Sequence, residues 1–490
     1  MFYLGVDLGT SSVKVLLVDG KGKVVASTSE TYPLMMPHPG WSEQDPLEWW
    51  KAICVCIPKL LEGVDASQVA GLSVGGQMHG LVALDENDDV IRPAILWNDG
   101  RTGAQTDAMN AHFGKEGLLK LTGNLAFAGF TAPKLLWMRE NEPELFAKIK
   151  KIMLPKDYII YRLTGVHCCD YSDASGMLLL DVANRCWSKE IMEYCGVERS
   201  QLGDLYESYE KVGTVKPDMA ELLGIPASTV VAAGAGDNAA AAVGTGTVGE
   251  GTCNISIGTS GTIFIPSKEC KIPPEGNLHA FAHSDGTYHL MGCILAAASA
   301  YTWWRKDILK GTSDNEEQAE ITQDKLGNNH VYYLPYLMGE RSPHNDPAAR
   351  AVFAGMTLDT TRSDMTQAAM EGVAFAIRDS VEIVRSLGID IKASNLCGGG
   401  AKSPIWRQIF ANVCNLELTV PDSEEGAGYG AAILAMVAAG EYENVIEACK
   451  AMPSGGKTYT PDPEIVARYD KRYATYKALY PALKPSFPNM

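Results

Sequence analysis

The stretch VDLGTSSVKVLLVD, residues 6–19, consists of two apolar segments separated by a short turn of glycine and hydroxyl residues. Residues 3–6 and 13–18 on either side are rich in β-branched and apolar side chains, a composition that favours β-strands. Glycine, serine and threonine between two such segments indicate a tight connection. The sequence therefore predicts a β-hairpin close to the N-terminus.

The turn of this hairpin has the composition of an anion-binding loop. Its backbone N–H groups form a concave set of donors, and the hydroxyls of Thr10, Ser11 and Ser12 add donors for phosphate oxygens. Asp7 at the entrance would repel a phosphate directly. Phosphate binding here therefore requires a cation between them, most naturally Mg²⁺ held through water. The alternative is an ordinary hairpin without a ligand.

The bulk composition excludes several classes of partner. The chain of 490 residues has 42 Lys and Arg against 59 Asp and Glu, a formal net charge of −17. An acidic chain of this kind is not suited to nucleic acid or to an anionic membrane surface. No apolar run approaches the ~20 residues of a membrane span, and no basic segment precedes an apolar one at the N-terminus. We therefore expect a cytoplasmic protein that binds no membrane.

Apolar and amphipathic segments alternate along the chain. Residues 69–74, 90–97 and 230–233 predict strands, and residues 46–61 and 365–386 predict helices. This alternation is typical of an α/β protein with a largely covered sheet. We expect closing helices after about residue 441.

The opening pattern recurs in the middle of the chain as NISIGTSGTIFI, residues 254–265. Two such hairpins half a chain apart indicate duplicated domains, which we place at residues 1–246 and 247–490. Hairpins at equivalent places of paired domains would face each other across a cleft and hold one polyphosphate from both sides. A glycine turn in LCGGGAKSPIWRQIFANV, residues 396–413, adds a third loop that opens a helix.

With these loops the chain resembles the superfamily of sugar kinases, hexokinase, Hsp70 and actin. The resemblance implies an α/β fold of two ribonuclease H-like domains that flank a cleft for ATP and, in the kinases, for sugar. It also implies that the glycine turn, and Gly399 in it, lies against the adenosine.

Three further stretches have side chains suited to a polyol. GGQMHG, residues 75–80, follows a predicted strand, at the place where open α/β sheets bind ligands; a structural histidine at position 79 is the alternative. WNDGR, residues 97–101, sets an aromatic face beside amide, carboxylate and guanidinium groups, or else forms a charged surface turn. GDN, residues 236–238, places an acid between an apolar strand and an alanine-rich helix, where an N-cap is the alternative.

Asp237 in the GDN stretch is the candidate for a catalytic base. Phosphoryl transfer from ATP to an alcohol needs a group that accepts the hydroxyl proton, and a carboxylate is the usual choice. The amide of Asn238 is placed to hold a neighbouring hydroxyl.

Taken together, these residues resemble the FGGY carbohydrate kinases. GFTAPKLLWMREN, residues 129–141, and AVFAGMTLDTTRSDMTQAAMEG, residues 351–372, are similar to the two signature segments of that family. GQMHG, RPAILWNDGR, LPKDYI, YSDASG and PYLMGERSPHND look like the members that phosphorylate D-xylulose. The resemblance covers residues 2 to about 439. It implies ATP with Mg²⁺, D-xylulose as the sugar in xylose catabolism and, from family habit, a homodimer.

Alternatives remain inside and outside this family. Ribulose, fuculose, gluconate or glycerol is the acceptor for other FGGY kinases. An actin- or Hsp70-like ATPase would explain both hairpins, but it gives no purpose to the three polyol stretches.

The resemblance also implies roles for individual residues. Asp237 is implied to take the proton from the 5-hydroxyl, and Asp7 to act through the metal and the phosphates. Met78 and His79 are implied sugar contacts, and from their chemistry we add Asp99, Arg101 and Asn238. The positions that match nucleotide contacts are Thr10, Ser11, Lys14, Thr259 and Gly399. Arg341 in GERSPHND either touches the ligand or ties its loop to the domain.

Overall fold

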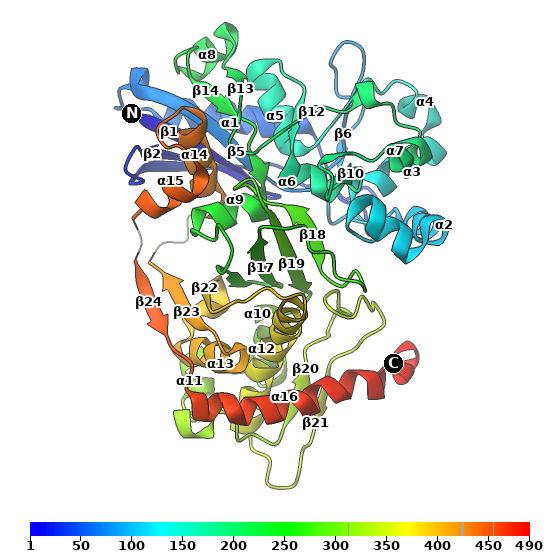
Figure 1. Ribbon diagram of the computed structural model, residues 1–490, viewed down its shortest axis with the longest axis vertical. Helices are drawn as coiled ribbons and strands as arrows, with labels where there is room; N and C mark the ends of the chain where they lie inside the picture. The colour runs from blue at the N-terminus through cyan, green and yellow to red at the C-terminus, as the bar shows by residue number, and fades with distance from the viewer. Residues whose placement is uncertain (312, 423–425, 454) are drawn as a thin grey trace.

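The computed structural model of the protein describes residues 1–311, 313–422, 426–453 and 455–490. Figure 1 shows two lobes, each built around a mixed β-sheet with helices against it. The N-terminal hairpin belongs to the upper lobe and the second hairpin to the lower lobe.

The first sheet has the strand order β13-β14-β5-β1-β2-β3. β1, β2 and β3 pair antiparallel, and β5 and β14 continue the sheet parallel to β1. The strands are β1 (Phe2–Leu8), β2 (Ser12–Asp19), β3 (Val24–Thr31), β5 (Val69–Gly76), β13 (Lys211–Thr214) and β14 (Val230–Ala232), and the short β15 (Ala235–Gly236) pairs with the end of β5.

The second sheet repeats this arrangement in the order β18-β19-β17-β16-β22-β23-β24. β16, β17 and β19 pair antiparallel, and β22 and β23 run parallel to β16. The strands are β16 (Asn254–Ile257), β17 (Gly261–Ser267), β18 (His279–Ala282), β19 (Tyr288–Ile294), β22 (Ala393–Cys397), β23 (Glu417–Pro421) and β24 (Gly456–Tyr459). The common topology of the two sheets confirms the predicted duplicated α/β fold.

The burial of the strands follows from their sequences. β1 lies in the middle of its sheet, and its residues Leu4, Val6 and Leu8 are fully buried. β3 lies at the edge and alternates between partly buried and exposed residues, as expected for a strand with one face in water.

The predicted strands at 69–74 and 230–233 and the predicted helices at 46–61 and 365–386 are confirmed, as β5, β14, α1 (Pro46–Leu60) and α12 (Arg362–Ser386). The prediction of a strand over 90–97 was wrong except at β7 (Ala94–Ile95). Pro93 has no N–H for a ladder, and Val90 makes only an isolated bridge. The prediction of closing helices was incomplete, because β24 lies between α15 (Val445–Ala451) and α16 (Pro463–Leu483).

The remaining helices are α2 (Gly103–Thr122), α3 (Thr131–Asn141), α4 (Pro143–Phe146), α5 (Pro155–Thr164), α6 (Tyr171–Ala174), α7 (Lys189–Cys195), α8 (Pro217–Leu223), α9 (Asp237–Gly244), α10 (Ala298–Trp303), α11 (Asp314–Gln318), α13 (Pro404–Cys414) and α14 (Gly426–Ala438). The remaining strands are β4 (Glu43–Gln44), β6 (Val82–Leu84), β8 (Lys151–Met153), β9 (Cys168–Asp170), β10 (Leu180–Asp181), β11 (Cys186–Trp187), β12 (Asp204–Tyr206), β20 (Tyr332–Leu334) and β21 (Val352–Ala354). None of the helices in the described part of the chain has the length and apolar character needed to cross a bilayer.

Helix α14 packs on the first sheet although it follows β23 of the second sheet in the chain. In Figure 1 it lies in orange beside the blue strands β1 and β2, and it contacts β1, β5 and α9. The approach is close because glycines meet backbone: a Cβ built on Gly430 would lie 1.7 Å from the carbonyl oxygen of Ala240, and one on Gly5 would lie 1.9 Å from that of Gly428. Helix α14 is therefore held on the first sheet and on α9 by a contact that leaves no room for side chains.

We expect Gly430→Ala to destabilise the protein. The added methyl has to displace the backbone of α9, and overpacking of this kind costs about 2–3 kcal/mol, which lowers Tm by about 5 °C. Gly103→Ala is the matched control, because a Cβ at Gly103 meets no atom within 4 Å. Thermal unfolding of both variants checks the prediction, and equal Tm values would contradict it.

Candidate active site

The first hairpin places Asp7 near the carboxyl end of β1, in the middle of the sheet. The turn is closed by a hydrogen bond from Gly9 N–H to Ser12 O of 3.1 Å. Asp7 is the register partner of Lys14 on β2 and of Gly75 on β5. Burial raises the pKa of the Asp7 carboxyl to about 6, against the opposing effect of the Lys14 charge.

A polar network joins this hairpin to two of the three stretches that were predicted to bind a polyol. The Thr10 hydroxyl donates to Gln77 Oε1 at 3.2 Å and accepts from Trp97 Nε1 at 3.0 Å. Gln44 Nε2 donates to Thr10 O at 2.6 Å. Ser11 is exposed at the tip of the turn. Gln77 and Trp97 belong to stretches that were predicted to bind a polyol, whereas Gln44 was not predicted, because its role depends on contacts between distant segments.

Strand pairing brings Asp237 close to Asp7. Gly75 of β5 is the register partner of Asp7 on one side and of Ala235 on the other. Asp237 follows two residues later as the first residue of α9, so it is not the N-cap, which is Gly236. Burial raises the pKa of Asp237 to about 7, and the charge of Asp7 contributes to the rise.

Asn238 and Met78 lie beside this carboxylate. Asp237 Oδ1 accepts hydrogen bonds from the backbone N–H of Asn238 at 2.7 Å and from its side-chain Nδ2 at 2.9 Å. The same Nδ2 lies 4.0 Å from Met78 Sδ. Asp7, Asp237, Asn238 and Met78 therefore form one group at the ends of β1 and β15.

His79 continues from Met78 with a left-handed backbone, φ 68°. Its Nδ1 lies 2.7 Å from the carbonyl oxygen of Gly176, so Nδ1 carries the proton. Burial, with the Lys134 charge as a further cause, holds the His79 pKa well below its ordinary value. The imidazole is therefore neutral, and its Nε2 is an acceptor for a hydroxyl proton.

A fully buried charge network lies behind Asp237. Ser172 Oγ accepts the N–H of Gly236 at 3.1 Å, and Asp170 Oδ2 accepts from the Ser172 hydroxyl at 2.5 Å. Lys156 Nζ pairs with Asp157 and lies 2.9 Å from Asp170 Oδ1. LPKDYI and YSDASG, which in the sequence are only family markers, thus fix the backbone that presents Asp237 in the fold.

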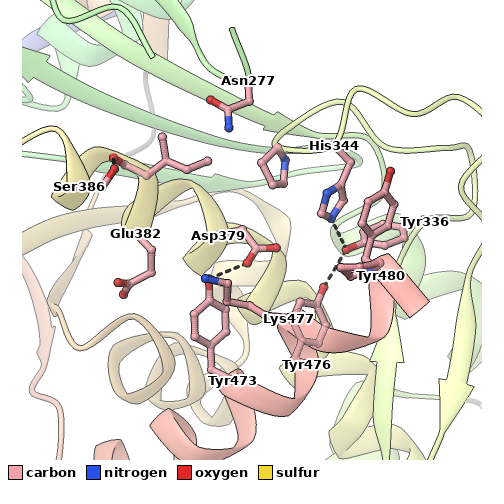
Figure 2. Close-up of a pocket in the computed structure, with 13 residues that line it drawn as sticks. Asn277, Tyr336, His344, Asp379, Glu382, Ser386, Tyr473, Tyr476, Lys477 and Tyr480 are labelled. Atoms are coloured by element: carbon pink, nitrogen blue, oxygen red, sulfur yellow. Dashed lines mark hydrogen bonds between the residues drawn. The ribbon is translucent and has the colours of Figure 1, made fainter. Parts of the chain in front are cut away.

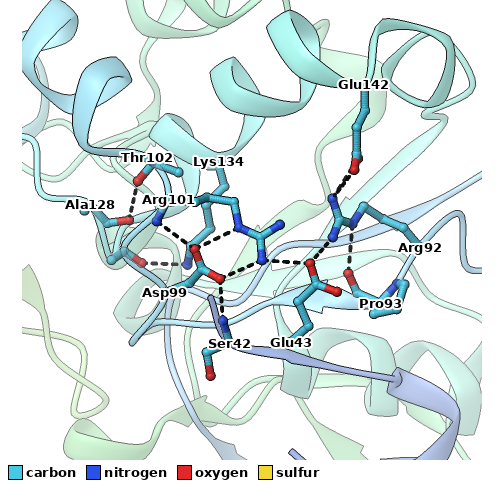
Figure 3. Close-up of polar contacts among 11 residues, drawn as sticks. Ser42, Glu43, Arg92, Pro93, Asp99, Arg101, Thr102, Ala128, Lys134 and Glu142 are labelled. Atoms are coloured by element: carbon cyan, nitrogen blue, oxygen red, sulfur yellow. Dashed lines mark hydrogen bonds and ion pairs between the residues drawn. The ribbon is translucent and has the colours of Figure 1, made fainter. Parts of the chain in front are cut away.

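Asp99 and Arg101 belong to a different network, shown in Figure 3. Asp99 accepts from Arg101 Nε at 2.8 Å and from Ser42 N–H at 2.6 Å. The Arg101 guanidinium also lies 2.7 Å from Glu43 Oε1 and 3.6 Å from the Trp41 ring centre. The side chains of Arg101 and Asp99 are 1% and 0% exposed. The structure therefore pairs these two residues with each other rather than with the Asp7 and Asp237 group.

The turn of the second hairpin and the glycine turn lie next to each other, where two central strands of the second sheet end. Thr259 O, in the hairpin turn, accepts from Ala297 N–H at 2.9 Å and from Ser299 Oγ at 2.6 Å. Gly399 follows β22, the parallel neighbour of β16, so both turns lie at the carboxyl ends of adjacent strands. A Cβ at Gly399 would meet no atom within 4 Å, so this backbone is open to a ligand.

A separate pocket of about 460 Å³ lies between α12 and α16, and it contains none of the predicted site residues. Figure 2 shows Tyr473 donating to Asp379, and Tyr336 in contact with His344 and Tyr476. The first contact ties α16 to α12, and the contact of Tyr476 with Tyr336 ties α16 to the loop after β20.

Comparison with known proteins shows the relatives of this chain. Models of the FGGY family of carbohydrate kinases match residues 2–244 with the N-terminal domain and 253–439 with the C-terminal domain. A xylulose kinase of Escherichia coli (strain K12) is 41% identical over 99% of this chain and 99% of its own.

Solved structures agree with this relationship. A xyloylose kinase from Brucella ovis superposes with a TM-score of 0.93 at 40% identity, covering 99% of this chain and 100% of its own. A gluconate kinase from Lactobacillus acidophilus has the same TM-score of 0.93 at 28% identity, covering 100% and 99%. The chain belongs to the FGGY family of carbohydrate kinases and is an ATP-dependent sugar kinase.

Proposed function

We propose that this kinase transfers the γ-phosphate of ATP to the 5-hydroxyl of D-xylulose, with Asp237 as the base. The observation that carries the reaction is the proximity of two carboxylates: Asp7 is the register partner of Gly75 on one side of β5, and Asp237 comes two residues after Ala235, the partner of Gly75 on the other side. The choice of sugar is supported by the xylulose kinase that is 41% identical over 99% of this chain.

The environment of Asp237 suits a base. An ordinary aspartate is a weak base at neutral pH, whereas a carboxyl with a pKa of about 7 accepts a proton more readily and is still largely ionised above that pH. The two Asn238 donors hold Oδ1 and leave Oδ2 to face a substrate hydroxyl. The buried contact from Gly236 to Ser172 keeps the carboxylate in that orientation.

The residues near the first hairpin fit Mg²⁺ bound together with ATP. In the described residues no three His, Cys, Asp or Glu side chains form a metal cage. Mg²⁺ usually keeps several waters and is held by one or two carboxylates together with substrate phosphates, which is what Asp7 and Asp237 offer. When bound, Mg²⁺ offsets the negative charge of the phosphates.

We assign nucleotide binding to the two hairpins and the glycine turn. Thr10, Ser11 and Lys14 act from the first hairpin, and Thr259 and Gly399 from the second sheet. The Thr10 hydroxyl is already fixed by Gln77 and Trp97, so the hairpin turn is ordered before the nucleotide binds.

The sugar contacts are assigned to Met78, to His79 through its Nε2 acceptor, and to Asn238. Asp99 and Arg101 stay in this set as predictions, although both are paired in a buried network. The domains at 1–246 and 247–490, a cytoplasmic location and a homodimer likewise stay predictions.

The fold alone does not separate D-xylulose from other acceptors, because the gluconate kinase superposes as well as the Brucella ovis protein does. Measuring ADP release with MgATP and D-xylulose, D-ribulose, gluconate or glycerol makes the distinction. We expect D-xylulose to give the highest kcat/KM over a low control without sugar. Preference for another acceptor would replace the substrate, and turnover indifferent to every sugar would refute the kinase assignment.

We expect Asp237→Asn to lower kcat by about 10²–10⁴-fold, because the amide does not accept the hydroxyl proton. KM values for sugar and ATP should stay within a few-fold. The same variant should be more stable at pH 8: burial raises the pKa of the wild-type carboxyl from 3.8 to about 7, so its ionised form is disfavoured by folding. Thermal unfolding should show a Tm above that of the wild type at pH 8, and the difference should shrink as the pH falls below 7 and vanish only below the unfolded-state pKa of 3.8. Wild-type kcat in the variant would contradict the role of the base.

The pH dependence of the wild-type enzyme should report both carboxyls. Asp237 loses its proton at about pH 7 and Asp7 at about pH 6, so log(kcat/KM) should rise with slope 1 between these values and with slope 2 below them. Asp7→Asn should reduce the slope below pH 6 to 1. A profile flat between pH 5 and 8 is the result that would exclude both groups.

A further inference from the structure

Arg341 lies in a connection whose neighbouring residues are fixed to the second sheet. Glu340 Oε1 accepts the N–H of Leu295 at 2.9 Å and that of Arg341 itself at 2.8 Å. Ser342 N–H donates to Cys293 O at 2.9 Å, and Ser342 Oγ accepts the N–H of Cys293 at 3.1 Å. Glu340 and Ser342 therefore tie the loop to the end of β19 on both sides of Arg341. The side chain of Arg341 takes no part in this attachment.

The guanidinium of Arg341 is left without a polar partner. Among the residues that the structure describes, it makes neither a hydrogen bond nor an ion pair, and its nearest recorded contact is the Phe127 ring centre at 5.6 Å. By contrast Arg350, on the same connection, donates to the carbonyl oxygens of Pro347 and Ala349. Arg341 is half-buried, and its guanidinium donors are held on a fixed loop without being used by a protein acceptor in the described part of the chain, so they are available to a ligand.

A cluster of rings places this guanidinium beside His79. The Phe127 ring lies 5.6 Å from that of Phe130 and 5.3 Å from His279, and the Phe130 ring lies 4.8 Å from His79. Burial lowers the pKa of His279 to about 3, and the Arg341 charge lowers it further; that charge also reaches His79. Both imidazoles are neutral, so they do not repel a cation here.

We propose that Arg341 binds the keto end of the sugar, donating to the C2 carbonyl oxygen and the C1 hydroxyl of D-xylulose. The proposal rests on the proposed function. Asp237, Asn238 and Met78 mark the reacting 5-hydroxyl. His79 follows with its ring turned towards Phe130, and Arg341 lies beyond that ring in the same cluster. The second lobe thus contributes a sugar contact to a site whose other sugar residues come from the first.

The chemistry of the side chain suits this end of the molecule. A guanidinium has only donors, arranged in a planar fork, and two adjacent oxygens such as a carbonyl and a hydroxyl match that fork. We do not assign Arg341 to the phosphates of ATP. Their proposed hydrogen-bond donors are the two hairpins, which lie at the ends of β1 and β16.

The test compares Arg341→Met with Arg341→Lys and with the control Arg350→Met. A hydrogen bond to a charged donor is worth enough that its loss should raise the KM for D-xylulose by about 10–100-fold. KM for ATP should change less than about two-fold, and the lysine variant, which keeps the charge but not the fork, should recover part of the loss. Thermal unfolding shows that each variant is folded, and Arg350→Met should match the wild type. An unchanged KM for D-xylulose in Arg341→Met overturns the proposal.

A second substrate locates the contact on the sugar. 1-Deoxy-D-xylulose lacks the C1 hydroxyl, so its KM should exceed that of D-xylulose in the wild type, and this ratio should fall towards 1 in Arg341→Met. A ratio that is the same in both proteins overturns the proposed orientation. Turnover of D-xylulose by the wild type is measured first and tests the proposed function separately. If the wild type is active on D-xylulose and Arg341→Met has the same KM for it, only this inference is refuted.

Discussion

The position of Asp237 beside Asp7 depends on two residues without side chains, Gly75 and Gly76, at the carboxyl end of β5. A Cβ on Gly75 would lie 3.0 Å from the Cβ of Ala240, and one on Gly76 would lie 2.7 Å from the Cβ of Lys156. These glycines let α9 and α5 approach the strand from its two faces. A side chain is excluded at Gly236 as well, because a Cβ built there would lie 2.9 Å from Met78 Sδ. The site is therefore a close-packed arrangement of backbone, into which two carboxylates project.

Such packing explains the chemistry of the carboxylates and its cost. Excluding water raises the pKa of both Asp7 and Asp237, and the first charge opposes the second. A buried site is unfavourable for an ionised carboxylate, so the backbone that carries Asp237 needs rigid support. The buried residues Lys156, Asp170 and Ser172 supply this support through the N–H of Gly236. Asp173 in the same network has both oxygens without a hydrogen-bond partner, and burial raises its pKa well above 3.8 against the opposing charge of Lys156, whose Nζ lies 3.7 Å from Oδ2.

Local patterns in the sequence predicted the parts of the fold that are themselves local. Both hairpins, the main strands and the glycine turn were predicted because each depends on a few adjacent residues. Pairings between distant segments were not predictable in this way. Asp99 and Arg101 have the chemistry of a polyol site, but Ser42, Glu43 and Trp41, more than fifty positions away, engage them. β24 was missed because its residues are mostly exposed and polar, as is common for an edge strand.

The two repeated sheets follow the order of the chain, but the helices that pack on them do not. Strands β16 to β24 form the second sheet, yet α14, which follows β23, covers β1 and β5 of the first. The connection after α9 is held by the second lobe, where Asn395 Nδ2 donates to Thr245 O at 2.7 Å and Gly249 N–H donates to Asp285 at 2.8 Å. Each lobe therefore holds a segment that belongs to the other in chain order. Any rotation between the sheets would bend the chain at the ends of α9 and α14. Asp237 lies at the opposite end of α9 from this connection, so the proposed base belongs to the first sheet. Thr259 and Gly399, which we propose to hold the nucleotide, belong to the second sheet. Such a rotation would therefore move the nucleotide relative to the proposed base.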